Sequence, residues 1–380
     1  MTVTPARERL LAEVPDLFAR LETSATADRA VAILQPVADT PGPSQIASST
    51  RGRVVAGLVG DAGLLDRGAV YSSDAFGSGC DMLEFGELGA TLVAHLDEIS
   101  YLVAGARSEH GWPLAAYCYH LADGERDAAA IRSWPDGEYG IASEGHLHTS
   151  EGTAYYRPAS GDGDLLPCDR VVLRSPLRWD PQGGQVTGSL DNAAGAAAAV
   201  LAADVLVDLG IPFRLVLTDE EEGPAGASTQ TIARGASRIL RCLSPSPVTI
   251  VTDIHGLSPT ELARVDGHRV PWGASLAEYS SATRGAVTPP GLYRGMADLL
   301  RSCEGDGVKV RENIGGHVPR SDDVVAMLHS PSIGLLGYPG INRHFDRGLP
   351  AANLHDLANL ARALAVVAAA VASGIIGSCP

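Results

Sequence analysis

Positive charge is scarce in this chain of 380 residues. It holds 29 lysines and arginines against 45 aspartates and glutamates, so its formal net charge is -16, and Lys309 is its only lysine. A surface this acidic repels phosphate backbones and anionic lipid headgroups. We therefore expect neither nucleic acid nor a membrane as a partner.

Cysteine is also scarce, and no two cysteines form a C-x-x-C pair. The six cysteines are widely scattered, at Cys80, Cys118, Cys168, Cys242, Cys303 and Cys379. This spacing argues against cysteine-based zinc sites and against thioredoxin-like chemistry. It favours free thiols in a reducing compartment.

Long hydrophobic runs are missing from both ends of the chain. The N-terminus is charged and carries apolar residues at helical spacing, so it predicts an amphipathic helix and not a signal peptide. The apolar run Ala363 to Ile376 is short and is interrupted by Ser373 and Gly374, which favours a buried or interface helix over a membrane span. We expect a soluble, cytoplasmic protein.

The chain is long for one domain, and 45% of its residues are hydrophobic, enough for a sizeable core. Between about residues 107 and 178, short β-like runs alternate with Gly and Asp turns, and no long helical period appears. We predict a small β-rich domain at 107–178, inserted between two parts of a catalytic domain at 1–106 and 179–380.

The most informative stretch runs from Gly188 to Ala227. A turn that carries Asp191 precedes the Ala-rich segment Ala193 to Leu209, whose composition favours a helix. The apolar run Phe213 to Leu217 then predicts a buried strand, which ends shortly before the glutamates Glu220, Glu221 and Glu222. A strand, a crossover helix and a strand in this order should be parallel, and ligands bind at the carboxyl edge of such sheets.

Three other apolar runs also end at a residue that can bind a metal ion. These are Thr91 to Ala94 before His95, Val248 to Thr252 before Asp253, and Ile333 to Tyr338, followed by a Pro-Gly turn, before His344. Imidazole and carboxylate groups suit zinc or related ions, and one carboxylate can bridge two ions. The collected candidates for a metal site are His95, Asp191, Glu221, Asp253 and His344.

These segments resemble a known family, the dinuclear metallo-aminopeptidases that include the tetrahedral (TET) and glutamyl aminopeptidases. The matching segments are AHLDEISYLV at 94–103, GSLDNAAG at 188–195, LTDEEEG at 217–223 with Gly226 and Ala227 after it, TD at 252–253, and YPGINRHF at 338–345. They follow the family's order over most of the chain. The resemblance implies an α/β fold of the zinc-exopeptidase type: a mixed, mostly parallel central sheet flanked by helices, with a small inserted β-rich domain for dimerisation.

The resemblance also implies a site for two divalent metal ions, zinc first, with cobalt or manganese as alternatives. Asp191 would bridge the ions, His95 and Asp253 would complete the ligands of one, and Glu221 and His344 those of the other. A short carboxylate on a turn suits the bridge, because co-catalytic ions lie about 3.5 to 4 Å apart. Taken alone, Asp191 could equally be a turn or N-cap residue.

Two further carboxylates have expected catalytic roles. Asp97 lies two positions after His95, so on a strand it would point the same way and orient the imidazole ring. Adjacent glutamates diverge in extended backbone, so one can bind a metal ion while the other faces the bound water as general base. The resemblance makes Glu220 the base and Glu221 the ligand.

Several positions depart from the family pattern. Glu222 stands where the relatives usually carry an apolar residue, and His255 adds an imidazole near the site. His317 and Asp322 lie in the region where the relatives have a Gly-Gly-Thr-Asp run that lines the substrate cleft. Asp322 could line this cleft or cap the helix that follows. The roles of these four residues stay open.

The resulting expectation is a metal-dependent hydrolase, an aminopeptidase that removes N-terminal residues from peptides or amino-acid amides by metal-activated water. Alternatives on the same scaffold are an amidase, deacylase or carboxypeptidase, a single-zinc acyltransferase or cyclase, and a binding protein whose site has decayed. The resemblance further implies a homo-oligomer, a dimer or a dodecamer. The sequence leaves the side-chain specificity and the physiological metal open.

Overall fold

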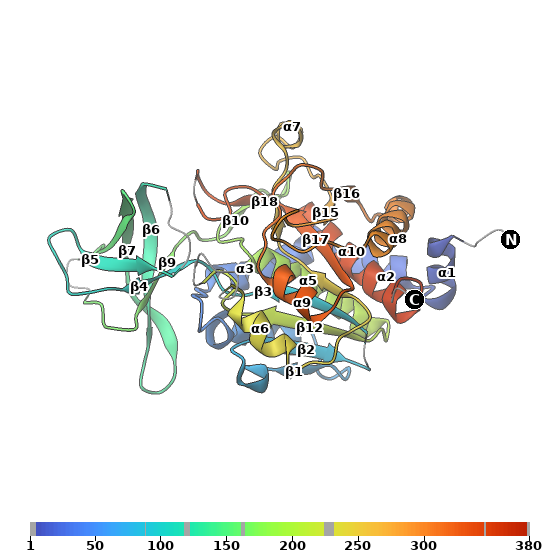
Figure 1. The fold of residues 1–380 in the computed structure, drawn as a ribbon, viewed down its shortest axis with the longest axis horizontal. Coiled ribbons are helices and arrows are strands. Elements are labelled where there is room, and N and C mark those ends of the chain that lie inside the picture. The colour runs from blue at the N-terminus through green and yellow to red at the C-terminus, as the bar shows by residue number, and fades with distance from the viewer. Residues whose placement is uncertain are drawn as a thin grey trace.

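The computed structural model describes residues 5–87, 89–117, 122–160, 164–223, 232–345 and 347–377. At its centre is a nine-stranded sheet with helices on both faces, and a closed barrel projects from one side of this body (Figure 1). The predicted fold class is confirmed: a mixed α/β fold with a mostly parallel sheet and a small additional β-rich unit.

The strands of the central sheet are β1 (Val70–Ser72), β2 (Asp81–Phe85), β3 (Ala90–His95), β12 (Phe213–Thr218), β13 (Thr249–Val251), β14 (Ile254–His255), β15 (Ala274–Ala277), β16 (Val310–Glu312) and β17 (Ile333–Pro339). Their order is β1-β2-β12-β3-β13-β17-β15-β16, with β14 beside β17. The four middle strands β12, β3, β13 and β17 are parallel. Their carboxyl ends therefore meet at one edge of the sheet.

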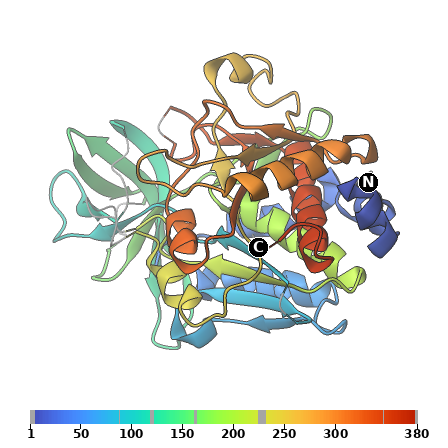
Figure 2. The same ribbon diagram turned by 45° about the vertical axis from the view of Figure 1, so that its right-hand side comes forward.

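Helices cover both faces of this sheet (Figure 2). They are α3 (Ala27–Asp39), α5 (Ala193–Asp208) and α10 (Leu354–Ala372) on one face, and α6 (Arg234–Leu240) and α9 (Asp322–His329) on the other. Leu92 and Leu215 pack toward the first group, whereas Val93 and Val216 pack toward the second. Because both faces are buried, the strands are continuous apolar runs without polar alternation.

The helix α10 lies in the core against α5 and α3. It is the one helix in the described ranges that is long and apolar enough to cross a membrane, but 83% of its most apolar window is buried inside the molecule. This packing is that of a core helix.

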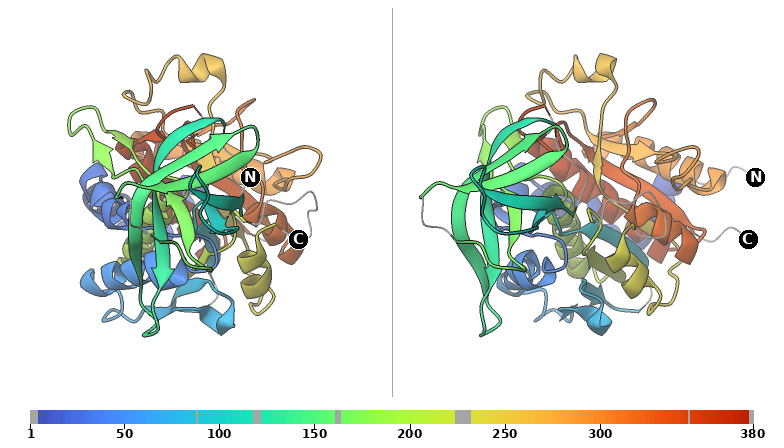
Figure 3. Two further views of the ribbon diagram at one scale, coloured as in Figure 1. Left: turned by 90° about the vertical axis from the view of Figure 1, so that its left-hand side faces the viewer. Right: turned by 60° about the vertical axis from the view of Figure 1, so that its left-hand side comes forward.

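The barrel consists of β4 (Ser100–Val103), β5 (Trp112–Ala116), β6 (Gly124–Ser133), β7 (Tyr139–Ser150), β8 (Thr153–Pro158) and β9 (Arg170–Leu173). It has its own core around Tyr101, Leu147 and Tyr156, and Figure 3 shows it from its outer side. Its first strand precedes the predicted boundary at residue 107, because only a short turn separates β4 from β3. Residues 118–121, which include the end of one predicted β-like run and Cys118, lie outside the described residues.

The remaining elements are α1 (Ala6–Glu13), α2 (Leu17–Ser24), α4 (Arg53–Asp61), α7 (Pro259–Leu262), α8 (Pro290–Ser302), β10 (Arg178–Trp179), β11 (Gln185–Thr187) and β18 (Ala351–Asn353). The single N-terminal helix expected from the sequence is two helices, α1 and α2. Pro15 lies between them and cannot continue a helix, because it lacks the N–H group. The cysteines Cys80, Cys168, Cys242 and Cys303 are free, and Cys379 lies outside the described residues.

Asp356, in the first turn of α10, makes the stability of the fold depend on pH. Its buried carboxylate accepts hydrogen bonds from the backbone N–H groups of Trp272 and Gly273, at 3.1 and 2.6 Å. Burial raises the pKa of Asp356 to about 7 from its ordinary value of 3.8. Its contribution to the free energy of unfolding is therefore fully present below the ordinary pKa, and it is lost as the pH rises to about 7.

We expect this one group to lower the free energy of unfolding by about 1.4 kcal/mol per pH unit across that interval. Urea titrations of the wild type and of Asp356→Asn at several pH values measure the effect. Asparagine keeps the shape but cannot ionise, so the variant should have the shallower dependence on pH. Equal slopes in the two proteins would contradict the prediction.

Candidate metal centre

The predicted ligands come together at the carboxyl edge of the sheet. His95 ends β3 and is in register with Thr218, the last residue of β12. Asp253 and His344 follow β13 and β17. Asp191 lies in the turn before α5, and the next residue, Asn192, fixes this turn: its side chain donates to the Thr252 carbonyl at 2.8 Å and accepts from Gly195 N–H at 3.1 Å.

Asp191 lies between the two histidines. Nε2 of His95 is 3.3 Å from Asp191 Oδ1 and 3.7 Å from Asp253 Oδ1. Nε2 of His344 is 3.7 Å from the other oxygen of Asp191. The two oxygens of one carboxylate thus face two imidazoles, which is the arrangement that a carboxylate bridging two ions requires.

The donor set fits divalent cations. Asp191 Oδ1 is buried, and it makes no hydrogen bond within the described part of the chain. His95 holds the pKa of Asp191 at about 2 against the effect of burial, whereas burial and the charge of Asp191 raise the pKa of Asp253 to about 6. Buried carboxylates this close repel one another. A cation between them would remove that repulsion and give the unpaired oxygen a partner.

The three glutamates after β12 do not alternate as extended strand residues do. Glu220 has a left-handed backbone, with φ of 57°. Its carboxylate accepts hydrogen bonds from Arg238 at 2.6 Å and from the Tyr117 hydroxyl at 3.2 Å, and it lies 3.5 Å from Arg234. Gly223 packs so close to Tyr117 that an added Cβ would lie 2.2 Å from its carbonyl oxygen. Both oxygens of the Glu220 carboxylate are thus engaged by these partners. The sequence had instead predicted a carboxylate that faces a metal-bound water.

Glu222 lies where Glu221 was expected. Its carboxylate is 3.1 Å from His344 Nε2, and together with Asp191 and His344 it forms a group whose potential ligand atoms are all within 4.8 Å of one another. Glu221 Oε2 lies 3.8 Å from His95 Nε2. Burial raises the pKa of Glu221 well above its usual range, and the charges of Glu222 and Asp253 add to this effect while His95 opposes it. In the sequence, the departure from the family pattern at Glu222 was the signal that could have revealed that Glu222, and not Glu221, lies beside His344.

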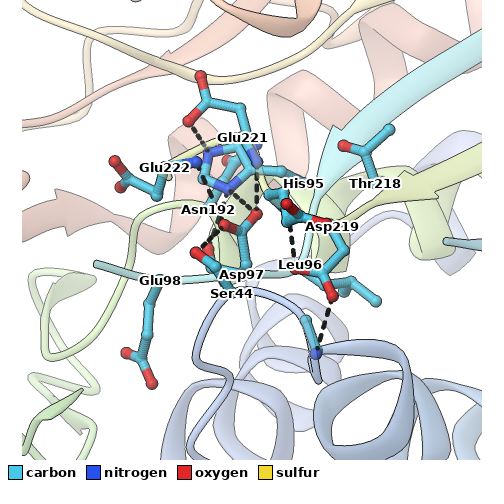
Figure 4. A network of polar contacts seen from close by, with 12 residues as sticks. Ser44, His95, Leu96, Asp97, Glu98, Asn192, Thr218, Asp219, Glu221 and Glu222 are labelled. Carbon is cyan, nitrogen blue, oxygen red and sulfur yellow. Dashed lines mark hydrogen bonds and ion pairs between the residues drawn. The ribbon is translucent and has the colours of Figure 1, made fainter. Parts of the chain in front are cut away.

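Asp97 connects His95 to the glutamate loop (Figure 4). Its carboxylate accepts hydrogen bonds from the N–H groups of Glu221 and Glu222, at 3.1 and 3.2 Å, and from the Ser44 hydroxyl at 2.6 Å. Nδ1 of His95 lies 3.0 Å from the Asp97 backbone carbonyl and 3.6 Å from its carboxylate. A proton on Nδ1 donated to that carbonyl leaves Nε2 free to bind a metal ion.

The other residues noted in the sequence surround the cluster. His255 is buried, hydrogen-bonded to the Ser275 hydroxyl at 2.9 Å, and burial together with the charge of His317 lowers its pKa to about 3. Asp322 begins α9 and accepts a hydrogen bond from the Thr218 hydroxyl, and burial raises its pKa to about 7. His317 lines a cleft beside the cluster. Gly226 and Ala227 lie outside the described residues.

No protein-family model and no curated protein matches this chain. Solved structures do match its fold. The aminopeptidase APDkam598 of Desulfurococcus kamchatkensis has a TM-score of 0.69 and 13% identity, over 93% of this chain and 99% of its own. The TET aminopeptidase of a marine-sediment thaumarchaeon has a TM-score of 0.69 and 13% identity, over 90% and 97%. The TET1 peptidase of Pyrococcus horikoshii has a TM-score of 0.62 and 18% identity, over 89% and 99%.

The chain has the TET aminopeptidase fold. Since the identities are low, the likeness extends to the fold and does not by itself transfer an activity. Within this TET fold, the cluster lies at the sheet edge to which the sequence motifs pointed.

Asp97→Asn is expected to weaken metal binding. Asparagine keeps only one accepting oxygen, so one N–H of the glutamate loop would lose its partner. Losing such an outer partner lowers metal affinity by roughly 10- to 100-fold. Competition with a chromophoric chelator measures the effect. Ser44→Ala, which keeps the Asp97 carboxylate, should lose less affinity, and an Asp97→Asn variant with wild-type affinity would contradict this role.

Proposed function

We propose that this protein is a metal-dependent aminopeptidase that uses two divalent ions, zinc or else cobalt or manganese, to hydrolyse the first peptide bond of its substrate. The observation that carries the proposal is the position of Asp191, whose oxygens lie 3.3 Å from His95 Nε2 and 3.7 Å from His344 Nε2. A TET aminopeptidase fold is a second, independent support.

Each ion has three candidate ligands. We assign His95, Asp191 and Asp253 to one ion, and Asp191, Glu222 and His344 to the other. Glu222 replaces the expected Glu221 because its carboxylate lies 3.1 Å from His344 Nε2. Imidazole and carboxylate ligands with an open position are typical of catalytic zinc sites.

Glu221 is our candidate for the general base. Its carboxylate lies beside His95, and Asp97 fixes its backbone, so it is held at the cluster without being needed as a ligand. The bound ions would lower the pKa of a water molecule and stabilise negative charge on the scissile carbonyl oxygen. Glu221 would accept the proton of the attacking water and return it to the leaving amine. Glu220 would hold the loop in place through Arg238 and Tyr117.

We also propose that the protein forms a homo-oligomer through its barrel. The barrel projects from the main body (Figure 3). Trp134 and Ile141 on the barrel are each 39% exposed. The TET1 peptidase of P. horikoshii is described as assembling into a tetrahedron or a large octahedral shell, and another structure of the same kind as a dodecamer.

The function is tested by metal analysis combined with substrate assays. The protein is expected to bind two ions per chain and to hydrolyse aminoacyl anilides that have a free N-terminal amine. Dialysis against a chelator should abolish this activity, and zinc, cobalt or manganese should restore it, because the ions activate the water. Fewer than two bound ions, or cleavage of N-acylated substrates alone, would contradict the proposal.

Glutamine substitutions separate the roles of the three glutamates. Glu221→Gln should keep both ions and lose activity by about 10²- to 10⁴-fold, as expected for a lost general base. Glu222→Gln should bind one ion fewer. Glu220→Gln is the matched control and should lose less activity than Glu221→Gln. A larger loss in Glu220→Gln, with both ions bound, would restore the assignment that the sequence resemblance implies.

A further inference from the structure

A groove of about 660 Å³ lies between α6 and α9. The two helices pack against each other over one face of the central sheet (Figure 2). Leu240 and Arg241 come from the end of α6, Val325 and Leu328 come from α9, and Arg284 comes from the loop between β15 and α8. The groove shares no described wall residue with the cleft beside the metal cluster. It is therefore a separate candidate site, and its size suits a small molecule.

Part of the groove wall is apolar. Leu240 is buried and Val325 is half-buried, whereas Leu328 is 80% exposed. No other large hydrophobic side chain in the described ranges has a larger exposed fraction. A single exposed leucine is ordinary on a protein surface, but this one borders a cavity with further apolar walls. A ligand with an apolar body would remove the Leu328 side chain from water, which favours binding.

The groove also carries positive charge, which is scarce in this chain. Arg241 and Arg284 are exposed, and neither forms an ion pair with a residue in the described ranges. The acidic residues outside these ranges are Asp162 and Asp346, and neither is adjacent in sequence to a wall residue. None of the described wall residues is acidic. The groove can therefore attract an anion although the net charge of the whole chain is -16.

The polar groups of the groove suit an oxyanion. A guanidinium can donate two parallel hydrogen bonds to such a group. His329 lies at the same groove, where burial and the charge of Arg214 lower its pKa, so its imidazole is neutral at pH 7. The His329 ring and the Ser237 hydroxyl can still form hydrogen bonds. Two cations, neutral polar groups and an apolar wall together match a small amphipathic anion.

The two helices of the groove also hold the glutamate loop. On α6, Arg238 donates to the Glu220 carboxylate at 2.6 Å. Directly before α9, the Ser321 hydroxyl donates to the Glu221 carbonyl at 3.1 Å. A ligand that touches both helices therefore favours the relative position of α6 and α9 in which both bonds are made.

The loop that carries Arg284 is connected to the same helix. The N–H of Ala286 donates to the Asp323 carboxylate at 3.3 Å, and the Ser280 hydroxyl donates to it as well. Asp323 lies in the first turn of α9. An anion bound by Arg284 would thus act on α9 through this loop as well as by direct contact.

We propose that the groove binds a small anion with an apolar body, and that this ligand activates the metal centre. Binding would stabilise the arrangement in which Arg238 and Ser321 hold the glutamate loop, so it would raise the fraction of chains with the loop in place. The activation rests on the proposed aminopeptidase function, whereas the binding of the anion does not.

A matched pair of probes tests the binding on the metal-loaded wild type. The anion is 2-naphthalenesulfonate, and methyl 2-naphthyl sulfone has the same aromatic body without the charge. A sulfonate is a weak ligand for divalent ions, so the metal centre competes little for the probe. Isothermal titration calorimetry should show an affinity about 10-fold higher for the sulfonate, as for two partly exposed ion pairs.

Variants show whether the groove is responsible. Arg241→Gln and Arg284→Gln should each lower the affinity for the sulfonate and leave that for the sulfone unchanged. Leu328→Ser should lower both affinities, because the apolar body loses its contact. The control is Arg294→Gln, an exposed arginine of α8 outside the groove, which should keep both wild-type affinities. All four substituted residues are exposed, so the variants should fold.

Enzyme assays test the activation. At saturating 2-naphthalenesulfonate, kcat/KM of the metal-loaded wild type for an aminoacyl anilide should rise about 5-fold, at the lower end of typical couplings between two sites. The double variant Arg241→Gln/Arg284→Gln should show no rise at the same concentration. Metal content is measured in each sample, so that a change in bound ions is recognised.

Equal affinities of the wild type for the two probes, or no binding of either, would overturn the binding site. A preference for the sulfonate that survives in the double variant would overturn it as well. With the sulfonate bound, an unchanged or lowered kcat/KM would overturn the activation. Failure of the proposed function is a different result: the metal-loaded wild type would then cleave no aminoacyl anilide, while calorimetry would still decide whether the groove binds the anion.

Discussion

One carboxylate, that of Asp97, holds the candidate site together. It accepts the N–H groups of Glu221 and Glu222 and the hydroxyl of Ser44, so it joins the end of β3 to the loop after β12 and to the N-terminal segment. The backbone carbonyl of the same residue sets the orientation of His95. Without these bonds the glutamate loop would lose its direct link to the segment that carries His95.

The central sheet fixes the strand ends that the hydrogen bonds of Asp97 connect. Four parallel strands end at one edge, and helices bury both faces of the sheet. The strand ends are therefore held in place, and the loops beyond them carry polar side chains. His95 lies at a strand end, Glu222, Asp253 and His344 lie on loops beyond these strands, and Asp191 lies in the turn before α5. The burial that makes the frame stable also excludes water from the carboxylates. Their mutual repulsion is therefore strong, and the proposed cations would offset it.

The sequence predicted the fold class because buried parallel strands are continuous apolar runs, which are visible without a structure. It also placed His95, Asp253 and His344 after strands, and Asp191 in the turn before the Ala-rich helix. It did not predict the positions of the three glutamates, because the turn at Glu220 depends on Arg238 and Tyr117, which are distant in sequence. The break at Pro15 was visible but was outweighed by the apolar spacing.

The hydrogen bond between Tyr117 and Glu220 joins the barrel to the main body. Tyr117 follows a barrel strand, whereas Glu220 begins the loop that carries the proposed base and ligand. The barrel is therefore in direct contact with the glutamate loop. A chain reduced to sheet and helices would lack the hydroxyl that contacts Glu220. In the proposed oligomer, contacts made by the barrel would reach the glutamate loop through Tyr117.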